Sequence, residues 1–169
     1  YLQVAERAAR AGGAVLQDWL GRIVAREKSP KDLVTEADVA SQQVIEKTLL
    51  AAFPDHAFLR EEESSTGNGN SDSLDWLNES FCWVVDPLDG TVNYVHGLQP
   101  FAVSIALMQE GQPLVGVVYD PCSGECYTAE RGQGAHLNGK LLRSSDCESL
   151  DQSLVAASFP PDVARGALE

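Results

Sequence analysis

Residues 101–119, FAVSIALMQEGQPLVGVVY, give the clearest secondary-structure signal in the chain. Residues 101–109 and 114–119 are rich in β-branched and other apolar residues, as strands are. The four residues between them, EGQP, contain the glycine and proline typical of a tight turn. This pattern predicts a β-hairpin, and with it an antiparallel sheet.

Further strands are predicted on both sides of this hairpin. Downstream, turns rich in glycine, proline and asparagine separate short strands at residues 126–129, 135–137 and 141–142, and residues 153–157 would add another. Upstream, the apolar run FCWVV at 81–85 and a short segment at 57–60 also resemble strands. The Gly-, Asn- and Ser-rich residues 64–73 are predicted to form an exposed loop.

Two amphipathic helices are predicted before these strands. In residues 2–20 the apolar side chains recur at steps of three and four, which is the helical period. A second helix is predicted from Thr35 to about residue 52, with Thr35 as N-cap and Asp38 three positions later. Helices followed by a meander of strands favour the α+β class, with helices packed on a mainly antiparallel sheet. We see no repeat or linker in the sequence that divides it.

Composition restricts the class of protein. The 169 residues, 44% hydrophobic and 22% charged, suit one globular unit. No apolar run approaches the ~20 residues of a membrane span, and no signal peptide is recognisable. A net charge of −13 argues against bulk binding of nucleic acid. Four cysteines without a metal-ligand pattern favour reduced thiols, so we expect a cytoplasmic protein.

The acidic residues are unevenly distributed. Residues 32–89 carry 13 acidic and 2 basic side chains, a net charge of −11, whereas residues 1–31 have a net charge of +3. Such a concentration away from the chain ends raises the question of whether bound cations neutralise some of the carboxylates.

The sharpest chemical signal is DPLDGT at residues 86–91, directly after the strand at 81–85. The carboxylates of Asp86 and Asp89 and the carbonyl of Leu88 are hard oxygen donors, which suit Mg²⁺. Gly90 would allow a backbone N–H to approach an anion closely, and a short helix beginning there would aim further donors at it. A divalent metal beside an anion site describes a centre for phosphate-ester chemistry.

These motifs also have purely structural interpretations. Asp86 would serve as an N-cap, Pro87 as the first helical residue and Asp89 as a first-turn acid that suits the helix dipole. The run EEE at 61–63 would be a solvated face, and Asp38 the capping partner of Thr35. The two interpretations of Asp86 and Asp89 have about equal weight on the six residues alone.

Taken together and in order, the motifs resemble the inositol monophosphatase family. The resemblance rests on DLVTEAD at 32–38, the glutamates after Phe58-Leu59, DPLDGT with Asn93, FAVSI at 101–105, GVVY at 116–119 and GQGA at 132–135. It covers nearly the whole chain. It implies the N-terminal α+β half of an αβαβα sandwich phosphatase fold over residues 1–169, with the C-terminal α/β half absent, in a superfamily of Mg²⁺-dependent, lithium-sensitive enzymes.

The resemblance implies metal ligands for two or three Mg²⁺ ions. Asp86 would bridge two ions, the Leu88 carbonyl would bind the first, Asp89 would bind the second, and Glu61 would bind a metal and orient the attacking water. Glu62 would be its neighbour in the family's Glu-Glu pair. Because three glutamates follow Arg60 here, where the family has a glycine before the pair, the first ligand is Glu61 without a gap or Glu62 with a one-residue insertion.

The resemblance also assigns residues to the phosphate and the water. Gly90 and Thr91 would bind phosphate through backbone N–H groups together with Asp89, and the Thr91 hydroxyl would place the water. Asp38 would accept a hydrogen bond from Thr91. Lys28 corresponds to a lysine near the third metal. The family's later Trp-Asp motif, which completes the second metal site, is absent, since Trp19, Trp76 and Trp83 precede Leu, Leu and Val.

These residues favour Mg²⁺-dependent hydrolysis of a small phosphomonoester by metal-activated water, with inositol-1-phosphate as the first candidate. Histidinol phosphate, fructose-1,6-bisphosphate and a nucleotide 3′-phosphate are alternatives within the superfamily. From another class, the 169-residue chain would be a catalytically silent metal-binding or interaction fragment. The expected partners are a small phosphorylated substrate and, because dimers are common in the family, a second copy, with no nucleic acid and no membrane.

Overall fold

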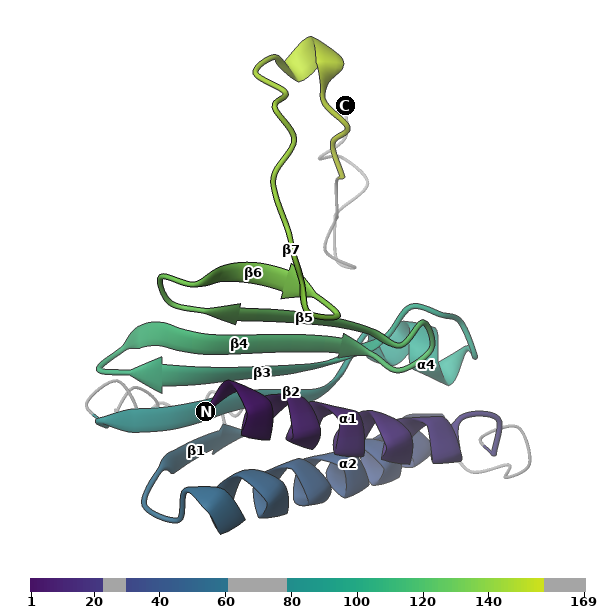
Figure 1. The fold of residues 1–169 in the computed structure, drawn as a ribbon. Coiled ribbons are helices and arrows are strands. Elements are labelled where there is room, and N and C mark those ends of the chain that lie inside the picture. Colours follow the sequence, from purple (N-terminus) through teal and green to yellow (C-terminus); the bar gives the residue numbers. More distant parts are fainter. Residues whose placement is uncertain (23–29, 61–78, 157–169) are drawn as a thin grey trace, which may run out of the picture.

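Two helices cover one face of a seven-stranded sheet in a computed structural model that describes residues 1–22, 30–60 and 79–156 (Figure 1). The strands lie side by side in chain order, β1 to β7; β1 pairs with β2 in parallel and the later pairs are antiparallel. The α+β prediction, with helices on a mainly antiparallel sheet, is therefore confirmed. The bounds are α1 Leu2–Trp19, α2 Pro30–Ala52, β1 Ala57–Arg60, β2 Phe81–Asp89, α4 Thr91–Val95, β3 Ala102–Gln109, β4 Gln112–Asp120, β5 Glu125–Glu130, β6 Gly134–Leu137, β7 Lys140–Leu141 and the 3-10 turn η3 Leu150–Gln152.

The hairpin predicted at the centre of the sequence is formed by β3 and β4. Gln109 pairs with Gln112, so the connection is the two residues Glu110 and Gly111, shorter than the four expected. Both have positive φ, 51° and 72°, which is the turn geometry that matches the right-handed twist of the flanking strands. A φ of 51° is uncommon for a non-glycine residue such as Glu110.

The core lies between the helices and the face of the sheet that they cover. Alternate residues of β3, Val103, Ile105 and Leu107, are buried toward the helices, whereas Ser104 and Ala106 between them are partly exposed. Burying each such side chain contributes roughly 1.5–3 kcal/mol. The rest of the core includes Ala5, Ala8, Ala9, Leu16, Ala37, Ile45, Leu49, Trp83, Val85, Leu88, Tyr94, Phe101, Val115, Val117 and Cys126.

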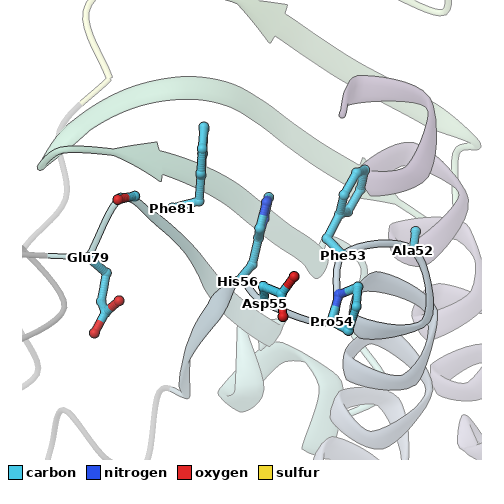
Figure 2. A pocket seen from close by; sticks show the side chains of 8 residues that line it. Ala52, Phe53, Pro54, Asp55, His56, Glu79 and Phe81 are labelled. Atoms are coloured by element: carbon cyan, nitrogen blue, oxygen red, sulfur yellow. The ribbon is translucent and has the colours of Figure 1, made fainter.

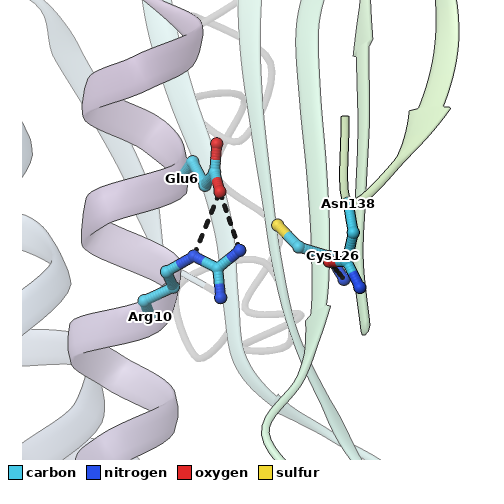
Figure 3. Close-up of polar contacts among 4 residues, drawn as sticks. All are labelled: Glu6, Arg10, Cys126 and Asn138. Carbon is cyan, nitrogen blue, oxygen red and sulfur yellow. Dashed lines mark hydrogen bonds and ion pairs between the residues drawn. The ribbon is translucent and has the colours of Figure 1, made fainter. Parts of the chain in front are cut away.

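Helix α1 also lies over β4 and β5, and Glu6 and Arg10 of the helix point toward the strand that carries Cys126 (Figure 3). Arg10 pairs with Glu6 at 2.8 Å, and its guanidinium carbon is 4.9 Å from the centroid of the Tyr119 ring. The hydrogen bond to Glu6 raises the pKa of Arg10, and burial raises the pKa of the adjacent Cys126 thiol. All four cysteines have free thiols.

Two sequence predictions need correction. Helix α2 begins at Pro30, so Thr35 lies inside the helix and cannot be its N-cap, and Asp38 is not its capping partner. Proline suits a first helical turn because its N–H is not needed there, and this preference outweighs the capping signal. Residues 153–156 do not form the expected strand: Leu154 and Val155 are exposed and irregular, with no neighbouring strand among the described residues.

Several predictions fall on residues that the structure does not describe. The loop at 64–73 and residue 157 belong to this group. Within the described ranges, no helix has both the length and the apolar character needed to cross a membrane.

Candidate active site at the end of strand β2

The DPLDGT segment forms a bulge at the end of β2. Asp86 pairs with Ser104 and Asp89 with Ala102, so three steps along β2 match two along β3, and β2 contains one extra residue. Pro87 lies in this gap, where its missing N–H costs no ladder hydrogen bond. The bulge changes the direction of the residues that follow it, and it therefore determines how the two carboxylates are presented.

The structure contradicts the purely structural interpretation of Asp86, Pro87 and Asp89, whereas metal binding by Asp86 stays a prediction. Asp86 and Pro87 both belong to β2, and the following helix begins only after Gly90, so Asp86 is not a helix N-cap, Pro87 is not the first helical residue, and α4 has no acid in its first turn. Instead, the Asp86 carboxylate folds back and its Oδ1 accepts the backbone N–H of Leu88 at 3.1 Å. Asp86 is half-buried and Asp89 is exposed.

Gly90 connects the bulge to α4 in a conformation that favours glycine. It is the N-cap of α4, with φ 88° and ψ 35°, as the sequence predicted for a short helix starting here. A Cβ at this position would lie 3.2 Å from the Pro100 carbonyl oxygen and 3.3 Å from the Phe101 Cα. A side chain would therefore be strained by both the backbone conformation and the close approach of residues 100–101.

Thr91 is the first residue of α4, and its hydroxyl donates to the Leu88 carbonyl oxygen at 3.1 Å. This is the carbonyl expected to bind a metal. A hydroxyl has a single proton to donate, so the expected donation from Thr91 to Asp38 would require the hydroxyl to rotate. Asp38 lies on α2, which contacts α4. The structure thus brings Asp86, Leu88, Asp89 and Thr91 together at the C-terminal end of β2, and it places Asp38 on the neighbouring helix α2.

Three anchoring residues around the bulge were not predicted from the sequence. The Ser41 hydroxyl of α2 donates to the Pro87 carbonyl at 3.2 Å, and the Asn93 side chain donates to the Pro100 carbonyl at 2.8 Å. The buried Tyr94 hydroxyl donates to the Leu16 carbonyl of α1 at 2.7 Å, and burial raises its pKa to about 12. A helix of five residues is not stable alone, and the contacts of Asn93 and Tyr94 fix α4 to the rest of the fold.

The donors that the structure describes fit Mg²⁺ in chemical type. Two carboxylates and a carbonyl are hard oxygen ligands. Within the described ranges, no group of three or more His, Cys, Asp or Glu side chains lies close enough to hold a metal ion. Glu61, Glu62 and Lys28 lie outside the described residues. Asp86, Leu88 and Asp89 therefore do not by themselves complete a metal site within the described residues.

The opposite end of β2 carries a different feature, a cavity of about 450 Å³ (Figure 2). His56 is stacked between Phe53 and Phe81, with ring centroids 5.0 and 4.8 Å apart. Its Nδ1 is buried without a hydrogen-bond partner among the described residues, and burial lowers its pKa, while Asp55 opposes that shift. The cavity lies beside this apolar stack and includes none of the predicted site residues.

The fold is that of one family of phosphatases. The model of the inositol monophosphatase family matches residues 1–169, and the chain belongs to this family of Mg²⁺-dependent phosphomonoesterases. The resemblance inferred from the motifs is thereby confirmed.

Individual relatives show how much of the family's length the chain represents. It is 39% identical over 163 residues to the fructose-1,6-bisphosphatase/inositol-1-monophosphatase of Aquifex aeolicus, covering 95% of this chain and 58% of that protein. It is 43% identical over 162 residues to the Nus factor SuhB of Pseudomonas aeruginosa, covering 94% and 58%. The crystal structure of inositol monophosphatase II from Staphylococcus aureus MSSA476 matches with a TM-score of 0.71 and 32% identity, covering 89% and 54%. The chain thus spans little more than half the length of these relatives.

Proposed function

We propose that the chain supplies the N-terminal half of a Mg²⁺-dependent phosphomonoesterase, with inositol-1-phosphate as its substrate and inositol and phosphate as its products. The observation that carries this proposal is the bulge at Asp86–Asp89, which presents two carboxylates and a carbonyl directly before the Gly90 turn. Family membership supports the same chemistry.

The metal ligands would be Asp86, the Leu88 carbonyl, Asp89 and one of the glutamates Glu61 and Glu62. When bound, two or three Mg²⁺ ions would make a water nucleophilic at neutral pH and neutralise charge on the phosphate ester. The clustering of acidic side chains in residues 32–89, with a net charge of −11, supports a site that needs cations.

The remaining residues would bind and orient. Backbone N–H groups of Gly90 and Thr91 would hold the phosphate. Glu61 and the Thr91 hydroxyl would align the attacking water with phosphorus, and Asp38 would fix the Thr91 hydroxyl, with Lys28 near the third metal. Because water is the nucleophile, no phosphoenzyme forms. Aligning the reacting groups in this way removes much of the entropic part of the barrier.

Two relatives support alternatives. The name of the Aquifex protein includes fructose-1,6-bisphosphatase, so fructose-1,6-bisphosphate is the second candidate substrate, ahead of histidinol phosphate and a nucleotide 3′-phosphate. The Pseudomonas relative is named a Nus factor, which supports the other class of function, a fragment that acts by interaction and not by catalysis.

The test is phosphate release by the natural gene product that contains this chain. We expect turnover of inositol-1-phosphate with Mg²⁺, slower turnover of fructose-1,6-bisphosphate, and loss of both when a chelator removes the metal. The 169 residues alone should release no significant phosphate, because the family's Trp-Asp motif is absent from them. Metal-independent turnover, or equal turnover by the 169 residues and the longer product, would contradict the proposal.

A further inference from the structure

Ser41 stands out because it is a polar residue in an apolar row. Within the described part of the chain its side chain is fully buried, with 0% exposure. It lies on the inner face of α2 in a row at steps of four with Ala37, Ile45 and Leu49, all of which are buried. A buried hydroxyl is costly unless it forms a hydrogen bond, so the contact that it makes is informative.

The hydroxyl contacts the bulge that presents the carboxylates. Ser41 Oγ donates to the carbonyl oxygen of Pro87 at 3.2 Å, and Pro87 itself is buried. Pro87 falls in the register shift between Asp86 and Asp89, where β2 does not pair regularly with β3. Ser41 therefore provides a hydrogen-bond donor to a buried carbonyl that lies where the regular pairing of β2 with β3 is interrupted.

The peptide group between Pro87 and Leu88 makes a hydrogen bond on each side, one to Ser41 and one to the carboxylate of Asp86. The Pro87 carbonyl and the Leu88 N–H belong to the same planar peptide unit and point in opposite directions. The N–H donates to Asp86 Oδ1 at 3.1 Å while the carbonyl accepts from Ser41. Rotation of this peptide plane would disturb both hydrogen bonds, and so the orientation of the Asp86 carboxylate depends on Ser41.

The helices leave the Ser41 hydroxyl little freedom to move. Helix α1 passes so close that a Cβ at Gly12 would lie 2.8 Å from Ser41 Oγ and 2.7 Å from Ile45 Cδ1. The side chain is thus enclosed by α1 on one side and by the bulge on the other. A rigid environment of this kind is what allows an outer hydrogen bond to orient a ligand.

We propose that Ser41 is a positioning residue, which fixes the Pro87–Leu88 peptide plane and thereby the direction of the Asp86 carboxylate toward a divalent cation. This inference rests on the proposed function, since it presupposes that Asp86 binds Mg²⁺. Outer hydrogen bonds of this type commonly alter metal affinity by about 10- to 100-fold.

The test is Mg²⁺ binding to the natural gene product, measured by isothermal titration calorimetry with the metal alone. In Ser41→Ala the peptide plane loses one of its two hydrogen bonds, and we expect the Kd for Mg²⁺ to rise about tenfold. Thr48→Ala is the matched control, because it removes a hydroxyl that donates within α2, to the Val44 carbonyl, and away from the bulge. Its Kd should equal that of the parent.

A second variant keeps the test informative if Ser41→Ala folds poorly. Ser41→Cys has a side chain of similar size with a weaker donor, and its Kd should fall between those of the parent and Ser41→Ala. A Kd for Ser41→Ala within twofold of the parent, or, where that variant does not fold, a Kd for Ser41→Cys equal to that of the parent, would overturn the role of Ser41 while the metal site stands. Absence of Mg²⁺ binding by the parent would instead overturn the proposed function, and the inference with it.

Discussion

The two ends of strand β2 are organised by different forces. At its N-terminal end Phe81 stacks on His56, which in turn stacks on Phe53. The Trp83 ring also contacts Phe53, with the two ring centroids 5.9 Å apart. At its C-terminal end a bulge is held by hydrogen bonds from Ser41 and Thr91 to successive carbonyls. One end is an apolar stack and the other a set of directed polar contacts.

The two ends of β2 should therefore affect different properties, namely protein stability at the aromatic end and the proposed Mg²⁺-dependent chemistry at the bulge. Ring stacking is tolerant of small displacements and contributes mainly through buried area. Hydrogen bonds to carbonyls are directional, so they fix the orientation of a peptide plane and of the oxygens attached to it. We therefore expect substitutions at the aromatic end to alter the free energy of unfolding, and substitutions at the bulge to alter Mg²⁺ binding and turnover.

The largest effect is expected for Asp89→Asn in the natural gene product. The exposed carboxylate would no longer bind the second metal, and kcat/KM for inositol-1-phosphate should fall about 100- to 1,000-fold. Without metal, the free energy of unfolding should change by less than about 0.5 kcal/mol because Asp89 is exposed. Glu130→Gln, an exposed carboxylate on β5, should leave turnover unchanged. Equal activity in Asp89→Asn and the parent would refute the assignment.

Phe53→Ala should show the opposite behaviour. It removes a ring that contacts both His56 and Trp83, and because Phe53 is only half-buried the loss should be about 3 kcal/mol, at the lower limit for buried aromatic residues. Urea unfolding measures this loss, and the Kd for Mg²⁺ should stay constant. Leu154→Ala, at a fully exposed residue, is the control. A large change in Mg²⁺ affinity in Phe53→Ala would break the distinction between the two ends.

Tyr94 links the bulge region to helix α1 and should confer sensitivity to alkaline pH. Burial raises its pKa from 10 to about 12, so between these values the unfolded chain loses a proton that the folded chain keeps. Stability should therefore fall as the pH rises above 10, by about 1.4 kcal/mol at pH 11. The loss of unfolding free energy between pH 9 and pH 11 should therefore be about 1.4 kcal/mol smaller in Tyr94→Phe than in the parent. The same pH dependence in both proteins would exclude Tyr94 as its source.

His56 should confer a smaller sensitivity in acid. Burial between the rings lowers its pKa below 6.5, with Asp55 partly opposing the shift, so the unfolded chain binds a proton first as the pH falls. Stability contributed by the neutral imidazole should be lost below about pH 6.5. Urea unfolding at pH 5 and pH 7 should show a smaller difference in His56→Phe than in the parent. An equal or larger difference in the variant would show that other groups dominate.

The sequence was sufficient for the order of the helices and of the strands β1 to β7, and for placing DPLDGT at the end of a strand. The 101–119 hairpin could be predicted because turn residues and periodicity are local signals. The bulge could not: the strand was expected to end at residue 85, but β2 continues to Asp89 with a register shift after Asp86. The start of α2 was wrong because a good N-cap signal at Thr35 competed with Pro30, and only the folded helix decides between them. The strand expected at 153–157 was wrong where the structure describes it, because a strand needs a partner that local sequence does not specify.

The anchoring residues were missed for a different reason. Ser41 could have been noticed as the one polar residue in the row Ala37, Ser41, Ile45 and Leu49, but its acceptor lies 46 residues away. Tyr94 donates to Leu16 across 78 residues, and no pattern in the chain links these two positions. Long-range hydrogen bonds depend on how helices pack against the sheet, which composition and periodicity do not determine.

We propose that the C-terminal end of β2 binds Mg²⁺, and the melting temperature of the natural gene product with and without the metal measures this binding. A ligand that binds only the folded state adds about 2.7 kcal/mol of stability at a concentration 100 times its Kd. We predict that Mg²⁺ raises the melting temperature of the parent clearly and that of Asp89→Asn much less. An equal rise in both proteins, or no rise in either, would contradict a metal site at this end of the strand.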